Sequence, residues 1–217
     1  ATAAYAQEAP SGDGSTPLHW AAYRDELAKA DQLVRAGANV NAANDLGATP
    51  LWAASLNGSV AMVRTLLDAG ANPNAALLSG ETPLMVASRA GKPLVVEQLM
   101  KKGANPNARA ARGQTALMWA VPEYNRMIPH GSDTALMFAA RVGDVESAAL
   151  LVAAGANVND RDAWGVSATT LAAFSGHGDI ARLLLEKGAD PNVDQAGFTA
   201  LHCAIMRRDE ATVAALL

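Results

Sequence analysis

Four histidines and one cysteine are the residues of this 217-residue chain whose side chains most often serve in catalysis or metal binding. His202 and Cys203 are adjacent, but neighbouring helix residues point about 100° apart, so they would not form a working nucleophile pair. No cysteine or carboxylate stands at the short spacing that a zinc site needs. We find no supported Ser-His-Asp grouping and no phosphate-binding glycine loop with its lysine. The sequence therefore predicts a protein that is not an enzyme and needs no metal or cofactor.

Composition narrows the class of partner. The net charge is −4 and the pI about 5.5, so bulk attraction to nucleic acid or to an anionic membrane is not expected. No apolar run approaches the roughly 18 residues of a membrane span. Cys203 is the only cysteine, which excludes an intrachain disulfide and predicts a buried core thiol. No small-molecule substrate is expected either, because no cluster of polar residues marks a pocket for one.

The elements that carry these residues are best seen in the stretch from Gly47 to Ala75. Thr49 is a good N-cap and Pro50 a good first helical residue, so a helix is expected to begin here and to end at Gly58. A second helix follows, with apolar residues at i, i+3 and i+4, and Gly70 closes it. The two helices are predicted to form an antiparallel pair, followed by a projecting loop rich in Asn and Pro.

This unit recurs along the chain. The capping residues Thr16, Thr49, Thr82 and Thr115 are each 33 residues apart, and so are Thr134 and Ser167. The motif TPLHWAA opens the first unit, TPLWAAS, TPLMVAS, TALMWAV, TALMFAA and TALHCAI open others, and GANVN, GANPN or GADPN close them. A helix pair of this size cannot bury its own apolar face, so it must stack on its copies.

This period and these motifs resemble the ankyrin repeat from about residue 13 to residue 217. The resemblance implies an all-α solenoid of stacked antiparallel helix pairs with projecting β-turn loops. It also implies that His19 and His202, which follow the motif leucine, bond loop backbone and brace the next repeat.

About seven repeats are expected after a leader at residues 1–12. Their approximate bounds are 13–44, 45–77, 78–110, 111–132, 133–163, 164–196 and an incomplete 197–217. The fourth is interrupted, because Thr134 follows Thr115 by only 19 residues. A segment that contains two prolines stands where its second helix would be expected. Either a deletion shortens the solenoid, or residues that belong between Val121 and Pro122 are missing from the sequence. The exposed apolar faces that a deletion would leave favour the second alternative.

The family resemblance implies a partner-binding concave face, formed by the loop tips and the exposed edges of the first helices. The residues expected there are Tyr23, Arg24, Leu56, Arg89, Arg112, Arg141, Trp164, Phe174, Phe198 and Arg207. Arginine and large aromatic residues are enriched at interaction hot spots. The alternative for the arginines is that Asp45, Glu81 and Asp133 pair with them as solvated ladders.

The expected function is therefore a protein interaction module, a scaffold or a subunit of a larger assembly, whose partner is another protein. Two alternatives stay open: a regulator or stabiliser of a partner enzyme, and an accessory domain of a longer enzyme. The segment Ala4-Tyr5-Ala6 is consistent with the end of a secretory signal or with a degenerate repeat tail, so both a cytoplasmic and a periplasmic or secreted location remain possible.

Overall fold

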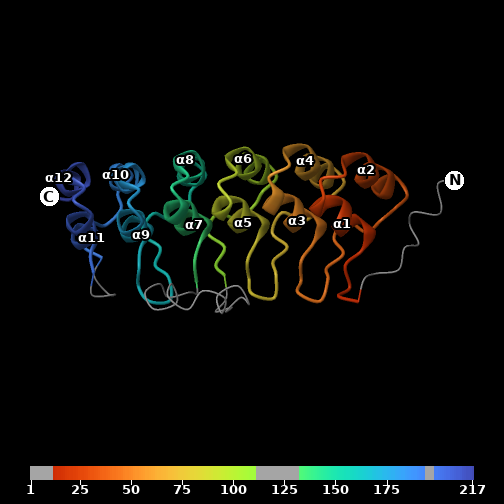
Figure 1. Cartoon of the computed structure of the whole chain (residues 1–217), viewed down its shortest axis with the longest axis horizontal. Helices are drawn as coiled ribbons and strands as arrows, with labels where there is room; N and C mark the ends of the chain where they lie inside the picture. Colours follow the sequence, from red (N-terminus) through yellow and green to blue (C-terminus); the bar gives the residue numbers. More distant parts are fainter. Residues whose placement is uncertain (1–11, 111–131, 194–197) are drawn as a thin grey trace. The chain divides into compact units, whose positions relative to one another are not determined.

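The computed structural model describes residues 12–110, 132–193 and 198–217. The chain divides into two compact units, Ala1–Asn105 and Pro106–Leu217, each built from helix pairs (Figure 1). The helices of unit 1 are α1 (Pro17–Tyr23), α2 (Leu27–Arg35), α3 (Pro50–Asn57), α4 (Val60–Asp68), α5 (Pro83–Arg89) and α6 (Pro93–Lys101). Those of unit 2 are α7 (Ala135–Val142), α8 (Val145–Ala153), α9 (Ala168–Ser175), α10 (Gly178–Glu186), α11 (Ala200–Arg207) and α12 (Glu210–Leu216).

Within each unit the helices form two rows. In unit 1, α1, α3 and α5 pack side by side, and each also packs on the helix that follows it. In unit 2, α7, α9 and α11 form the corresponding row, with α8, α10 and α12 behind them. The hairpin loops project from the row of first helices (Figure 1). The predicted all-α repeat architecture is confirmed.

The predicted caps begin and end these helices. The hydroxyl groups of Thr49, Thr82, Thr134, Ser167 and Thr199 each accept a hydrogen bond from the backbone N–H three residues ahead. Gly58 ends α3 in the left-handed conformation, with φ +80°, as expected. Asp25 takes the place of that glycine in the first repeat and is also left-handed, with φ +57°. The backbone turn is therefore the same even where a non-glycine residue must adopt it.

A leucine column forms the core of each unit. The second residue of α1, α3, α5 and α7 is a fully buried leucine, and α4, α6, α8 and α10 each bury another. Ala21, Ala22, Ala53 and Ala54 are also buried in unit 1, so the first helices approach one another through small side chains. This packing fixes the helix rows and leaves the loops and helix ends at the surface.

Asparagine side chains link successive repeats. Asn41 Nδ2 donates to the Gly70 carbonyl oxygen at 3.0 Å, and Asn41 Oδ1 accepts from the Asn72 N–H at 2.7 Å. Asn74 makes the same two bonds to Gly103 and Asn105. In unit 2, Asn107 bonds Gly155 and Asn157, and Asn159 bonds Gly188 and Asp190. The last asparagine of the closing motifs at 37–41, 70–74, 103–107 and 155–159 is thus a bridge to the next repeat.

The Asn107 bridge has an unusual length along the chain. Its partners are 48 and 50 residues ahead, whereas those of Asn41 are 29 and 31 residues ahead. The Ala110 N–H donates to the Asp133 carbonyl oxygen at 3.1 Å, and the Ser132 N–H donates to that of Ala110 at 2.8 Å. Ala110 and Ser132 are therefore hydrogen-bonded neighbours, and the Asn107 loop is bonded directly to the loop at Gly155 and Asn157.

The interrupted repeat predicted at 111–132 lies outside the described residues, apart from Ser132. The same is true of Arg112, of His130 and of the Val121–Pro122 junction. The number of repeats and their bounds remain predictions.

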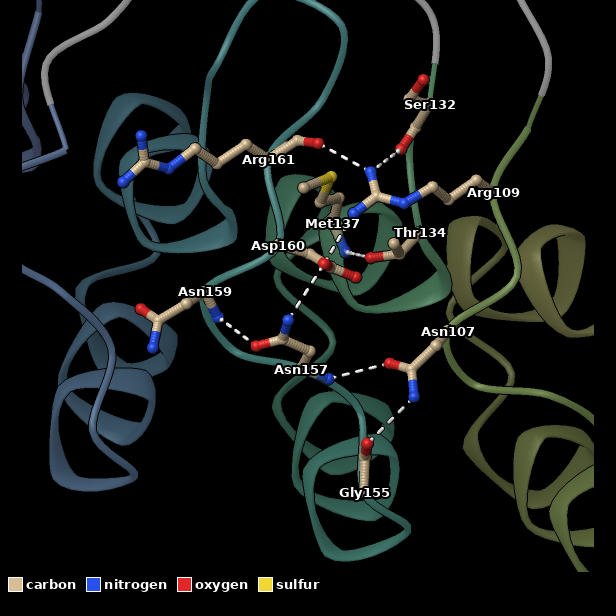
Figure 2. A network of polar contacts seen from close by, with 10 residues as sticks. All are labelled: Asn107, Arg109, Ser132, Thr134, Met137, Gly155, Asn157, Asn159, Asp160 and Arg161. Carbon is tan, nitrogen blue, oxygen red and sulfur yellow. Dashed lines mark hydrogen bonds and ion pairs between the residues drawn. The ribbon is translucent and has the colours of Figure 1, made fainter.

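Arg109 joins three loops of unit 2 beside the Asn107 bridge (Figure 2). Its Nη1 donates to the carbonyl oxygens of Ser132, at 3.3 Å, and Arg161, at 2.7 Å. Its Nη2 lies 2.6 Å from Asp160 Oδ1. A single exposed guanidinium therefore positions the hairpins that precede α7 and α9.

Candidate partner-binding surface

An exposed aromatic group stands at the end of α1 in unit 1. Tyr23 is 52% exposed and meets the Trp20 ring edge-on, with 6.3 Å between ring centroids. The Arg24 guanidinium lies over the Trp20 ring at 5.6 Å and also approaches Glu26 at 4.0 Å. Stacking on the indole orients Arg24 while leaving its charged end in solvent.

Trp20 was not among the predicted surface residues. It stands four residues after its capping threonine, and the same position in the next two repeats holds Ala53 and Val86, both buried. Trp20 itself is 38% exposed. The signal was available in the sequence, because a tryptophan occupies a position where the next two repeats have alanine and valine.

The hairpin tips of unit 1 present two large apolar side chains. Leu46 and Leu78 are 67% and 79% exposed, and the Leu78 N–H donates to the Leu46 carbonyl oxygen at 2.9 Å. This backbone bond holds the two tips next to each other. Leu56, which was predicted for the binding face, is only partly exposed. The tips are therefore the more accessible apolar surface.

Two of the predicted arginines are engaged within their own repeats. Arg89 Nη2 lies 3.0 Å from Glu81 Oε1, and Arg141 Nη2 lies 3.4 Å from both oxygens of Asp133. Burial raises the pKa of the Glu81 carboxyl, and the Arg89 guanidinium partly offsets that rise. The pairing alternative thus describes the geometry of these two arginines. The acids are buried, however, and do not form a solvated ladder.

Phe174 and Arg207 hold the last repeats of unit 2 together. Phe174 is partly buried and packs with Leu216 against Ala173, Ala200 and Cys203. The Arg207 Nε donates to the Phe174 carbonyl oxygen. Phe174 was expected to present its ring to a partner, but α11 covers part of it. Its surroundings are those of a packing residue.

Trp164 and Phe198 are the exposed aromatic residues of unit 2. Trp164 is 61% exposed at the tip of a hairpin, where its N–H donates to Asp162 Oδ1 at 2.8 Å. Phe198 is 52% exposed and meets the His202 ring edge-on, with centroids 6.4 Å apart. The backbone bond of Trp164 holds its hairpin, so its ring is presented to solvent at a defined place.

His19 and Cys203 have structural surroundings. His19 Nε2 lies 2.8 Å from the Ala48 carbonyl oxygen, and its Nδ1 accepts from the Thr16 N–H, which is the bracing role predicted for it. Burial lowers the pKa of His19 and raises the pKa of the Cys203 thiol, which is almost fully buried. Within the described residues, no three potential metal ligands come together.

A family model described as ankyrin repeats, in three copies, matches residues 3–77, 72–129 and 136–217. The chain belongs to the ankyrin repeat family. Ankyrin repeats are generally protein–protein interaction modules and typically non-catalytic. None of the helices in the described ranges is long and apolar enough to cross a membrane.

The ankyrin chain is similar to short stretches of three larger proteins. It is 40% identical over 65 residues to a mitochondrial disaggregase of Bos taurus, covering 30% of this chain and 10% of that protein. It is 34% identical over 96 residues to the E3 ubiquitin-protein ligase KEG of Arabidopsis thaliana, covering 41% and 6% respectively. A putative ankyrin repeat-containing protein of Treponema pallidum is 44% identical over 84 residues, covering 38% and 28%.

Proposed function

We propose that this ankyrin chain acts as a scaffold or subunit of a larger protein assembly and holds its partner at the hairpin tips and first-helix ends. The observation that carries the proposal is the exposure of large apolar side chains at equivalent loop tips: Leu46 and Leu78 in unit 1 and Trp164 in unit 2. Such groups reduce solubility unless a partner covers them.

Apolar and aromatic contacts, rather than a row of free arginines, supply most of the proposed recognition. Arg89 and Arg141 are already paired with Glu81 and Asp133, so a partner carboxylate would have to compete for them. Arg24 is more available, since its nearest carboxylate oxygen is 4.0 Å away. Together with Tyr23 it offers the aromatic and cationic contacts that are typical of interaction hot spots.

The partner we propose is a protein, and the mode of action is binding without catalysis. The net charge of −4 disfavours nucleic acid. A catalytic or small-molecule role would need clustered polar groups in a pocket, and we propose none.

A second candidate is that the ankyrin repeats serve as an accessory or regulatory part of a longer protein, including an enzyme. The matched stretches make up 10% of the bovine mitochondrial disaggregase and 6% of the Arabidopsis ubiquitin ligase. In those proteins, therefore, an ankyrin segment forms a small part of a chain named for an activity. This arrangement supports the alternative here.

Affinity capture with point variants tests the proposal. The chain would be immobilised and incubated with extract of its native source, and bound proteins would be identified by mass spectrometry. Trp164→Ala combined with Phe198→Ala should keep the helical circular dichroism and lose the specific partner. Val145→Ala, which shortens an exposed apolar residue at the start of α8, is the matched control and should retain it.

The same partner retained equally by the double variant and the control would show that unit 2 binds elsewhere. Leu46→Ala with Leu78→Ala would then test the tips of unit 1 in the same assay. A partner indifferent to all four substitutions would contradict the proposed surface.

A further inference from the structure

Two buried carboxyl groups belong to neighbouring repeats of unit 2. Asp133 precedes α7 and is 3% exposed, and Asp162 precedes α9 and is 6% exposed. Asp162 Oδ1 accepts the N–H groups of Trp164, at 2.8 Å, and Val166, at 2.9 Å. Asp162 Oδ2 is buried and accepts no hydrogen bond from the described residues. One oxygen is thus fully used in the hairpin turn, and the other lacks a donor.

The first two repeats of unit 1 show one way in which these two positions can be hydrogen-bonded. Asn44 stands five residues before its capping residue, as Asp162 does, and Ser15 stands one residue before its own, as Asp133 does. Asn44 Oδ1 accepts from the Leu46 and Ala48 N–H groups, and its Nδ2 donates to Ser15 Oγ at 3.1 Å. From the same register we infer that Asp162 Oδ2 faces Asp133, with a carboxyl oxygen in place of the amide donor.

We propose that Asp133 and Asp162 share a proton, so that the contact between the hairpins before α7 and α9 is tighter in acid than at neutral pH. With one proton between them, one carboxyl donates to the other and replaces the Asn44–Ser15 hydrogen bond. Without it, two anions face each other in a buried place, which is unfavourable.

The surrounding positive charges only partly offset the repulsion between the Asp133 and Asp162 carboxylates. Arg141 on α7 reaches both oxygens of Asp133, but at 3.4 Å, and its Nε is buried without a partner among the described residues. Arg109 is engaged with Asp160, and Arg161 lies 3.8 Å from Asp190. Burial raises the pKa of Asp133, Arg141 lowers it and Asp162 raises it.

The sign of the pH effect follows from this direction. A folded-state pKa above the unfolded value of about 3.9 means that the folded chain holds the proton more tightly. The stabilisation is complete below that unfolded value and is lost as the pH rises through the folded pKa. Each pH unit in this window changes the unfolding constant by up to about tenfold.

Asp162→Asn is the decisive substitution, because it restores the Asn44 arrangement. The new amide keeps the turn bonds through its oxygen and donates to Asp133 through its nitrogen. At pH 7 the unfolding constant of the variant should be at least about tenfold smaller than that of the wild type. Urea denaturation between pH 4.5 and 8 should also show a flatter pH dependence.

Two comparisons complete the experiment. Asn44→Asp makes the reverse change in unit 1: it removes the donor to Ser15 Oγ, whose hydroxyl already donates to Asp13 Oδ2 at 3.0 Å, so it should lower stability at pH 7. Carboxyl ¹³C titration by NMR should show one aspartate titrating above its ordinary range in the wild type and returning toward that range in Asp162→Asn. Glu81 contributes to both proteins equally, so the difference between them isolates the pair.

The proposal is overturned if Asp162→Asn is less stable at pH 7, if its pH dependence equals that of the wild type, or if all wild-type aspartates titrate normally. Asp133→Ser covers the case in which Asp162→Asn does not fold, because a serine hydroxyl there would donate to Asp162 Oδ2. That variant should lose the pH dependence too, and an unchanged dependence contradicts the pairing.

Discussion

Removing the side chain of Asn159 isolates the contribution of one bridge between repeats. Asn159 Nδ2 donates to the Gly188 carbonyl oxygen at 3.1 Å, and its Oδ1 accepts from the Asp190 N–H at 2.7 Å. Both partners are exposed, so water can solvate them after the change. Two neutral hydrogen bonds at about 0.5–1.5 kcal/mol each predict that Asn159→Ala lowers the free energy of unfolding by about 1–3 kcal/mol.

The chain contains its own control for this measurement. Asn192 occupies the same place in the closing motif GADPN, but its side chain makes no cross-repeat bond to the described residues. Asn192→Ala should therefore change stability by less than about 0.5 kcal/mol, as an ordinary surface substitution does. Urea denaturation followed by far-ultraviolet circular dichroism would compare the two variants. Equal losses in both would refute the bridge as a source of stability.

Four further substitutions test the elements around the bridges. Gly70→Val should destabilise unit 1 by about 1–2 kcal/mol in urea denaturation, because Gly70 has φ +91° and a Cβ would meet no atom within 4 Å, so backbone strain alone acts. Unchanged stability would mean that the turn tolerates a β-branched residue. Asp25→Gly should raise the melting temperature slightly, since Asp25 is left-handed at φ +57°; a lower value would show that its side chain matters more than the strain. Thr134→Ala removes the cap of α7 and should cost about 1 kcal/mol by the same denaturation assay, with no loss if water caps equally well. Glu81→Gln should flatten the pH dependence in unit 1: burial raises the pKa of Glu81, so its stabilising share is full below about pH 4.3 and falls as the pH rises through the folded value, and an unaltered profile would contradict this assignment.

The helices and their caps could be predicted because they depend on local sequence. Thr49 and Pro50 begin α3, and Gly58 ends it, in the places that the residue types demand. The 33-residue spacing then transferred this result to the other repeats, including α9, where Ser167 caps the helix without a following proline. Local preference and period agree along the whole described chain, which is why the fold class was accessible.

The surface residues were less predictable because exposure depends on the neighbouring repeat. Phe174 occupies a position that was predicted to face a partner, yet it packs against Ala200 and Cys203 of the next helix pair. Trp20 stands at the repeat position where Ala53 and Val86 are buried, yet Trp20 is exposed. The position of a residue within its repeat gives the direction of its side chain, but it does not say which residues of the neighbouring repeat cover that side chain.

The pairing of polar side chains could also not be predicted from the sequence of a single repeat. The acids Glu81 and Asp133 and the arginines that they bind stand eight residues apart in their repeats, and the sequence left open whether they pair or stay free. The cross-repeat bonds of asparagine could not be deduced either, because their partners come from the following repeat. Distances between side chains were needed to decide both.

Repetition separates the positions that stabilise an ankyrin chain from those that can vary with its partner. The capping residue and the bridging asparagine bond equivalent backbone atoms in successive repeats, and the buried leucine packs in the core. A change at any of them therefore affects folding. The loop tips carry no such duty: Leu46 and Trp164 differ in size, while the hairpins beneath them keep the same turn bond to Asn44 and Asp162. Substitutions at the tips should therefore alter binding with little effect on stability. Asp162 lies two residues before Trp164, so a change there should affect both binding and stability. A change in the protonation of the carboxylate pair would act on the hairpin that presents that tryptophan, so partner affinity measured from pH 4.5 to 8 should respond to Asp162→Asn if Trp164 is a contact residue.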